Sequence, residues 1–332
     1  MRIGIDAMGG DNAPHEIIKG AIEFINKNTT HQLFLFGKTE AINNGEINIK
    51  EYTNIELIDC PEVIDFNDEP VKAIRTKKNS SIVKGFQYLK NNKIDAFISA
   101  GNTGALLAGA TLIVGRIKGI DRPALLTLIP AKNGKFILID AGSNADCKPI
   151  NLVQFAYMSS IYMEKVLNVK NPTVGLLNIG TEEEKGNELI KTTHKMLKET
   201  KGINFIGNVE ARDIPYKVAD IVVCDGFVGN IALKLMEGMG LMFFDTLKEI
   251  AMQDFKSKIA GLLLKPKLKL LKQKYDYHEV GGAPLLGIDG VVFKCHGSSD
   301  AKAIYNGIKQ AVEFYEKKVI DTIKENVIIE NK

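Results

Sequence analysis

Short runs of consecutive apolar residues recur along the chain and predict buried strands. The apolar positions within each run are adjacent and do not alternate with polar ones, which is typical of strands covered on both faces in a largely parallel sheet. Each run ends in a glycine-rich or polar turn. The predicted strands cover residues 3–7, 33–37, 55–58, 96–99, 124–129, 136–139, 174–178 and 221–224.

Helical patterns fall between these runs. The alternation of strand and helix predicts an α/β fold in which right-handed crossovers connect parallel strands. No linker rich in Pro, Gly or Ser divides the chain, so we expect a single domain over residues 1–332. The clearest predicted helices cover residues 80–91, 152–167, 184–200 and 300–324.

Composition excludes several classes of protein. Lys and Arg (43) nearly balance Asp and Glu (40), and the hydrophobic fraction is 45%, so neither a disordered chain nor a globally basic nucleic-acid binder is expected. The four cysteines stand far apart without a CxxC pair, which predicts neither a disulfide framework nor a metal site, in a reducing compartment. These residues are Cys60, Cys147, Cys224 and Cys295.

Two stretches bear on membranes and secretion. The apolar run at residues 3–7 follows Met1 and Arg2 directly, so we expect no secretory signal there. No residue between Asp95 and Arg116 is charged, and that length approaches a membrane-spanning helix. Because a polar, glycine-broken turn lies in its middle, we predict a buried strand, a turn and a buried helix there instead.

Basic charge is concentrated in one segment, residues 256–274. It carries seven lysines and no acid, and without them the net charge of +3 would become −4. Pro266 predicts a break or kink. We predict a helical hairpin excursion at about 238–280 that lies on an anionic membrane, grips an acidic partner or packs on a second subunit. The residues expected to make this contact are Lys258, Leu262, Leu263, Lys265, Lys267, Leu268 and Lys269.

Six polar turns are candidates for chemistry. Ligands of parallel sheets bind at the carboxyl ends of the strands, where turns and helix starts present N–H groups. Five of the six turns have Asn, Ser, Thr or Lys beside glycine, which suits a phosphoryl or acyl-phosphate group; the turn at 6–11 has aspartates instead. The turns cover residues 6–11, 101–105, 140–146, 179–187, 225–230 and 296–300.

Familiar catalytic motifs do not occur in these turns. None matches GxGxxG with its following acid, GxxxxGK[ST] or GxSxG, which disfavours a nicotinamide dinucleotide, a Walker-type nucleotide and a serine nucleophile. The acids at 182–184 are predicted to complement the dipole of a helix start. Lys185, predicted in the same first turn, opposes that dipole and therefore indicates an anionic ligand.

Eight segments together resemble one known family, the bacterial phosphate acyltransferases of phospholipid synthesis (PlsX). The resemblance runs in order from residue 1 to about 308, whereas the lysine-rich segment matches in position only. The segments are MRIGIDAMGGDNAP, SAGNTGALLA, DAGSNADCKP, LNIGTEEEKGNE, GNVEARD, CDGFVGNIALK, GGAPLLGIDG and HGSSDA.

The resemblance implies a reaction and a fold. Fatty acyl-[acyl carrier protein] and inorganic phosphate would give acyl phosphate and free carrier protein, without a cofactor, and a membrane glycerol-3-phosphate acyltransferase would use the product. The implied fold is a three-layer α/β/α sandwich like isocitrate and isopropylmalate dehydrogenases, assembled as a homodimer. We expect a cytoplasmic protein that contacts the membrane surface reversibly.

For the reaction that the resemblance implies, hydrogen-bond donors matter more than general bases, because phosphate is already partly dianionic near neutral pH and needs little activation. Lys185 is expected to bind phosphate or developing oxyanion charge, and Asn230 to donate to the thioester carbonyl. The expected phosphate cradle consists of Asn102, Thr103, Gly104, Ser143 and Asn144. Further candidates for substrate contact are Gly180, Thr181, Gly229 and His296, with Asp6 and Asp11 equally suited to holding turns together.

Two other functions remain open from the sequence. A membrane-recruited scaffold that binds acylated carrier protein would need the lysine-rich segment but neither Lys185 nor Asn230. A short-chain phosphotransacetylase would act on acyl-coenzyme A and would differ in its preferred chain length.

Overall fold

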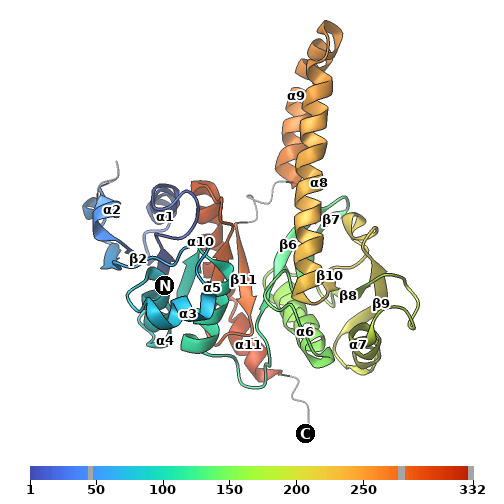
Figure 1. Ribbon diagram of the computed structural model, residues 1–332, viewed down its shortest axis with the longest axis horizontal. Helices are drawn as coiled ribbons and strands as arrows, with labels where there is room; N and C mark the ends of the chain where they lie inside the picture. Colours follow the sequence, from blue (N-terminus) through green and yellow to red (C-terminus); the bar gives the residue numbers. More distant parts are fainter. Residues whose placement is uncertain (44–47, 276–280, 328–332) are drawn as a thin grey trace.

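The computed structural model describes residues 1–43, 48–275 and 281–327, and its strands form two sheets (Figure 1). The seven-stranded sheet has the order β3-β2-β1-β4-β12-β11-β5, and its first five strands are parallel. Its members are β1 (Arg2–Asp6), β2 (Gln32–Gly37), β3 (Ile55–Asp59), β4 (Ala96–Ser99), β5 (Ala124–Leu125), β11 (Gly282–Leu286) and β12 (Val291–Cys295).

The five-stranded sheet has the order β6-β7-β10-β8-β9, and only β6 runs antiparallel to its neighbour. The predicted α/β fold is therefore confirmed, with its strands shared between two sheets. Its members are β6 (Thr127–Ala131), β7 (Gly134–Ile139), β8 (Thr173–Asn178), β9 (Asn204–Glu210) and β10 (Ile221–Val223).

Helices cover both faces of the seven-stranded sheet. Side chains alternate along its strands, so Leu33 and Leu35 pack on the α1 and α10 side, whereas Phe34 and Phe36 pack on the α3, α4 and α5 side. The α-helices are α1 (His15–Lys27), α2 (Thr39–Asn43), α3 (Pro70–Thr76), α4 (Ser81–Lys90), α5 (Thr103–Gly109), α6 (Pro149–Lys165), α7 (Glu188–Glu199), α8 (Gly226–Met252), α9 (Phe255–Tyr275), α10 (Ala301–Glu316) and α11 (Val319–Glu325).

One hydrophobic core joins the two sheets. Ile3 and Ile5 of β1 belong to the same buried cluster as Ile137 of β7, and α6 and α10 fill the space between. The rings of Tyr162 on α6 and Phe314 on α10 lie 6.0 Å apart. The two sheets therefore share one apolar core, and this packing fixes the position of the strand ends of one sheet relative to those of the other.

Several predicted elements differ from the structure. The predicted strand 124–129 divides at the buried Leu126, so that β5 joins one sheet and β6 the other. The predicted helix 300–324 ends at Glu316 and resumes as α11, because Lys318 adopts a left-handed conformation (φ +52°). Strands β9, β11 and β12 were not predicted as strands, since glycine and proline interrupt β9 and β11.

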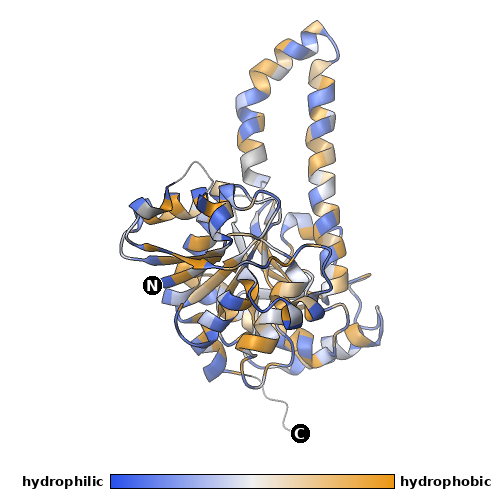
Figure 2. Cartoon of the chain, turned by 60° about the vertical axis from the view of Figure 1, so that its left-hand side comes forward, coloured by the Kyte–Doolittle hydropathy of each residue, from blue (hydrophilic) through white to orange (hydrophobic). Residues whose placement is uncertain are grey.

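Helices α8 and α9 lie side by side and project together from the five-stranded sheet (Figures 1 and 2). This helix pair begins at Gly226, before the predicted limit of about 238, and the chain turns near Asp254. Pro266 lies inside a continuous α9, so of the predicted break or kink at this position the break is wrong. The lysine-rich segment therefore lies along α9, one arm of the pair, and begins at the turn between the two helices.

Apolar side chains on this pair are widely exposed. Leu262 and Leu263 are 70% and 74% exposed, and the lysines at 258, 265, 267 and 269 are exposed as well. Among the described residues, α8 alone has the length and apolarity of a membrane-spanning helix, a test that core helices of soluble proteins also pass. The uncharged stretch around residues 96–115 forms β4, a turn, α5 and a π-helical segment, as predicted in outline.

Close packing at the start of α8 gives a test of the fold. A Cβ on Gly229 would lie 1.9 Å from the carbonyl oxygen of Asp140, so Gly229→Ala should lower the free energy of unfolding by at least about 2 kcal/mol. Gly238 lies in the same helix with nothing within 4 Å, and Gly238→Ala should instead gain up to about 1 kcal/mol. Urea denaturation of both variants measures the difference, and equal stabilities would contradict this packing.

Candidate functional site

The central strands of the five-stranded sheet bring three predicted turns together. Strands β7, β10 and β8 are adjacent and parallel, so the loops that follow them meet at one edge. Gly142, after β7, faces Asn230 in α8, whose Cβ would lie 3.4 Å from a Cβ built on the glycine. After β8, the side chain of Lys185 lies over Gly180, 3.1 Å from the corresponding position.

The turn after β7 is built around the buried carboxylate of Asp140. This side chain accepts hydrogen bonds from the backbone N–H groups of Gly142, Ser143 and Asn144 at 2.8–3.1 Å, and from Asn144 Nδ2 at 2.8 Å. Burial raises the pKa of Asp140, while these bonds act in the opposite direction. The backbone donors predicted as part of a phosphate cradle thus already hold an internal anion.

The start of α8 is fixed against the same turn. Asp225 caps the helix by accepting from Val228 N at 2.9 Å, and Gly226 N donates to Asn144 O at 2.7 Å. A Cβ on Gly226 would lie 2.7 Å from Asn144 N, so glycine is required for this approach. Gly229, predicted to touch substrate, has the same packing role against Asp140. Asn230 is thereby placed one turn into the helix, half-buried.

Lys185 lies in an exposed turn before α7. The predicted helix at 184–200 begins only at Glu188 with Asn187 as its cap, so the prediction that Lys185 opposes a helix dipole is wrong. Asn178 Nδ2 at the end of β8 donates to Lys185 O at 3.1 Å, which anchors the turn. The turn that carries Lys185 is thus tied to the sheet edge, and the methylene groups of the Lys185 side chain lie beside Gly180. Thr181 in the same turn is exposed.

The acids beside Lys185 do not complement a helix dipole, contrary to prediction. Glu183 instead accepts from Lys198 Nζ at 2.7 Å, and that partner lowers its pKa. Glu182 contributes its backbone carbonyl to Asn208 Nδ2 at 2.8 Å, and Asn208 in turn contacts His194 at 3.0 Å. These contacts shape the loop around Lys185, and the sequence offered no signal for Asn208 or His194.

The remaining predicted site residues gather at the edge of the other sheet. Asp6 at the end of β1 is buried, accepts from Ser99 Oγ at 2.6 Å and from Met8 N at 3.1 Å, and burial raises its pKa. Asp11 N donates to Gly297 O at 2.8 Å, which ties the turn after β1 to the turn after β12. Nδ1 of the exposed His296 lies 2.7 Å from Ser298 Oγ.

Asn102 holds neighbouring chain segments together. Its amide nitrogen donates to the carbonyls of Asp65 and Phe66 at 3.1 and 3.0 Å, and its oxygen caps α5 through Ala105 N. Thr103 is exposed at the helix start, and a Cβ on Gly104 would lie 2.6 Å from Pro70. The amide of Asn102 is therefore used internally. The structure places this turn and Ser143 on different sheets.

A buried lysine at this edge was missed by the sequence analysis. Lys294 in β12 is 8% exposed, and its ammonium donates to the carbonyls of Ala100 and Cys295. Burial lowers its pKa to about 8. The only sequence signal is a single lysine within the apolar run 291–295.

The cysteines are poorly suited to nucleophilic catalysis. Burial raises the pKa of Cys60 and Cys147 to about 12 and that of Cys295 to about 11, and the pKa of Cys224 lies well above its usual value. Because the thiolate is the reactive form, these thiols are unreactive near neutral pH. Among the described residues, no group of three or more His, Cys, Asp or Glu side chains is arranged to hold a metal ion.

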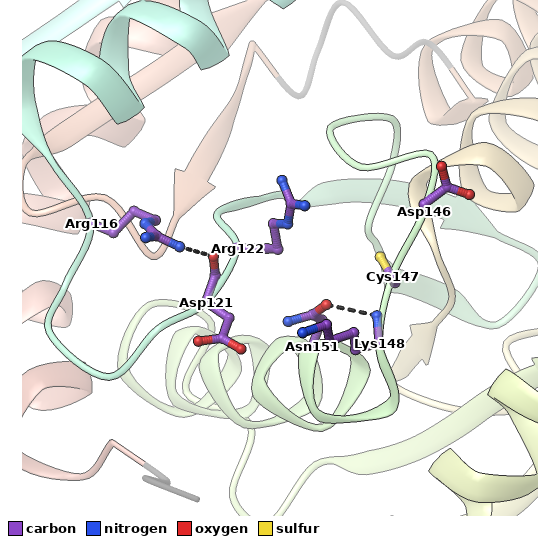
Figure 3. A pocket seen from close by; sticks show the side chains of 7 residues that line it. All are labelled: Arg116, Asp121, Arg122, Asp146, Cys147, Lys148 and Asn151. Carbon is purple, nitrogen blue, oxygen red and sulfur yellow. Dashed lines mark hydrogen bonds between the residues drawn. The ribbon is translucent and has the colours of Figure 1, made fainter.

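A cavity of about 390 Å³ lies at the N-terminus of α6, beside the turn after β7 (Figure 3). One wall comes from the segment that leads into β5, and the other from the chain that enters α6. None of its side chains was among the predicted site residues. The lining residues are Arg116, Asp121, Arg122, Asp146, Cys147, Lys148 and Asn151.

The fold is shared with acyl-transferring enzymes of known structure. A phosphotransacetylase from Streptococcus pyogenes superposes with a TM-score of 0.61 at 15% identity, covering 97% of this chain and 94% of that one. A branched-chain phosphotransacylase from Enterococcus faecalis gives 0.59 at 13% identity, covering 95% and 99%. At these identities the likeness extends to the fold alone.

Sequence comparison identifies the family. The family model described as "Fatty acid synthesis protein" matches residues 1–322. A phosphate acyltransferase of Caldicellulosiruptor bescii is 62% identical over 332 residues, covering 100% of this chain and 99% of that protein. That of Clostridium novyi is 55% identical, covering 98% of each. The chain therefore belongs to the phosphate acyltransferase family and is an acyltransferase.

Proposed function

We propose that the protein transfers a fatty acyl group from acyl carrier protein to inorganic phosphate, giving acyl phosphate for phospholipid synthesis. The observation that carries this proposal is the full-length similarity to phosphate acyltransferases, together with an exposed ammonium and an amide at neighbouring strand ends. A membrane glycerol-3-phosphate acyltransferase would use the product. The shared fold with phosphotransacetylases is compatible with the same transfer chemistry.

Phosphate is a sufficient nucleophile for this reaction. One of its oxygens attacks the thioester carbonyl, the carbon–sulfur bond breaks, and the carrier's thiolate leaves and takes up a proton. The neutral thiols of the chain make an acylated cysteine intermediate unfavourable. The protein must therefore position phosphate and stabilise the oxyanion that forms on the thioester carbonyl.

Lys185 and Asn230 are suited to these two tasks. The ammonium of Lys185 binds the phosphate charge, and the amide of Asn230, placed beside Gly142, donates to the carbonyl oxygen. The turn at Asp140 supplies rigidity and not ligands, since its N–H groups bind that carboxylate. The turns of the other sheet, with Thr103 and His296, remain candidates for substrate contact.

Exposed apolar side chains beside Asn230 favour a long acyl substrate. Phe227 and Ile231 of α8 are 62% and 53% exposed, and Ile179 after β8 is 80% exposed. They supply apolar surface next to the reacting groups that an acetyl group would not need. We infer a fatty acyl chain along this surface, with acetyl transfer as the alternative.

The helix pair is proposed as the contact with the membrane surface. Its exposed leucines and lysines on α9 suit an anionic lipid surface, where each lysine contributes about 1 kcal/mol. The same apolar side chains suit a second subunit, and a homodimer whose helix pairs also contact lipid reversibly satisfies both.

A thioester assay tests the function. The purified protein, mixed with palmitoyl-[acyl carrier protein], should release free thiol only when phosphate is present, and acyl phosphate should form in equal amount, measured as the hydroxamate. Acetyl-coenzyme A should be a poor donor in the same assay. Binding of the thioester without phosphate-dependent release would instead indicate a scaffold.

Variants at the site test the two roles. Lys185→Ala and Asn230→Ala should each lower kcat about 100- to 1000-fold, because one lost oxyanion or phosphate contact costs about 2.7–4 kcal/mol in the barrier. Lys195→Ala removes an exposed lysine from α7 and should keep the wild-type rate. Circular dichroism confirms that each variant is folded, and near wild-type rates in both site variants would contradict the assignment.

Sedimentation with vesicles tests the helix pair. The combined change of Lys265, Lys267 and Lys269 to Gln should lower binding to phosphatidylglycerol vesicles about 100-fold, since three lysines are lost near the surface. Changing the exposed Lys38, Lys118 and Lys195 to Gln removes the same charge elsewhere and should have little effect. Equal sedimentation of both triple variants would exclude lipid contact by α9.

A further inference from the structure

The cavity at the N-terminus of α6 has the composition of an anion site. Arg116, Arg122 and Lys148 supply three cationic groups against the carboxylates of Asp121 and Asp146 (Figure 3). Within the described part of the chain, none of the three cations lies within 4 Å of a carboxylate oxygen in an ion pair. The Arg116 guanidinium donates to the backbone carbonyl of Asp121, an uncharged acceptor that does not neutralise its positive charge.

Asn151 is a buried residue of the cavity wall whose side-chain donor also points to a bound anion. It lines the cavity, is 2% exposed, and its Nδ2 has no hydrogen-bond partner among the residues that the structure describes. The orientation of the amide is set by the other end, because Asn151 Oδ1 accepts from Lys148 N at 2.8 Å. If the amide were flipped so that Oδ1 and Nδ2 changed places, this hydrogen bond would be lost. Nδ2 is therefore the atom without a partner. A buried donor without a partner is costly unless a ligand accepts from it.

The helix itself favours negative charge at this place. Helix α6 is 17 residues long and has no acid in its first turn. Its cap position is occupied by Lys148, whose ammonium cannot accept from the N–H groups of that turn. Ser, Thr, Asp and Asn, whose side-chain oxygens can accept from these N–H groups, are preferred at this position. The positive end of the helix dipole thus adds to the charge of the three cations.

We propose that this cavity binds a phosphate group, held by Arg122, Lys148 and the amide nitrogen of Asn151. Its walls come from the segment entering β5 and from the start of α6, so the ligand would link chain segments that belong to the two different sheets. The source of the phosphate rests on the proposed function: either free orthophosphate or the phosphodiester that joins a carrier protein to its prosthetic arm. Both present anionic non-bridging phosphate oxygens, two in the monoanionic diester and more in orthophosphate.

Calorimetric titration of the full-length protein with sodium phosphate at constant ionic strength tests the site. Asn151→Asp keeps the acceptor for Lys148 N and the shape of the side chain, but replaces the donor with a negative charge. Asn151→Asp should raise the Kd for phosphate at least tenfold. Arg122→Gln, which removes an exposed cationic group from the cavity wall, should have the same effect. Lys118→Gln removes an equal charge from the same segment and should change the Kd less than twofold, and Lys185→Ala should retain binding in the cavity.

The source is distinguished by titrating carrier protein with and without its prosthetic arm. If the cavity takes free orthophosphate, the two variants raise its Kd as stated above. If the cavity takes the phosphodiester, the two variants instead abolish the preference for the form with the arm and leave orthophosphate binding unchanged. If neither orthophosphate binding nor that preference changes in folded variants, the inference is overturned, even when turnover is normal. If the wild-type protein releases no thiol in the thioester assay, the proposed function is wrong. The Kd values for phosphate in the cavity would not be affected by that result.

Discussion

The buried carboxylate of Asp140 is the constraint around which the functional edge is arranged. It lies at the end of β7 and accepts from three successive N–H groups of its own turn and also from Leu125 N at 3.1 Å, at the edge of the other sheet. Its backbone carbonyl sets how closely α8 can approach through Gly229. One charged group thus fixes a turn, a helix start and the crossing between sheets, because a buried carboxylate requires its donors.

A buried aspartate also organises a turn at the edge of the seven-stranded sheet. Asp6 at the end of β1 is also buried, and Ser99 and Met8 N satisfy it. In both motifs an aspartate followed by alanine ends a strand and collects the donors of the next turn. Because these N–H donors bind the aspartates, they stabilise the turns and are not free for a ligand, and the contacts proposed for catalysis fall to side chains such as Lys185 and Asn230.

Much of the local structure around the candidate site could be predicted from the sequence, and the predictions that were wrong have physical reasons. The turns rich in glycine and polar residues follow the ends of strands, as predicted, and parallel strands place their ligand sites at such ends. The role of Lys185 in a helix turn was wrong because Asn187 is the stronger cap and starts α7 later. Pro266 did not end α9, and nothing local in the sequence distinguishes a tolerated proline from a breaking one.

Local chemistry by itself determined the α/β class, the turns that hold polar groups and the concentration of lysines at 256–274, because periodicity and residue type act over a few positions. Tertiary structure alone decided that strand 124–129 divides between two sheets and that Gly142 meets Asn230. It also decided that Arg122 and Asn151 share a cavity. These relations depend on contacts between residues tens of positions apart, which packing of the common core establishes and no short pattern encodes.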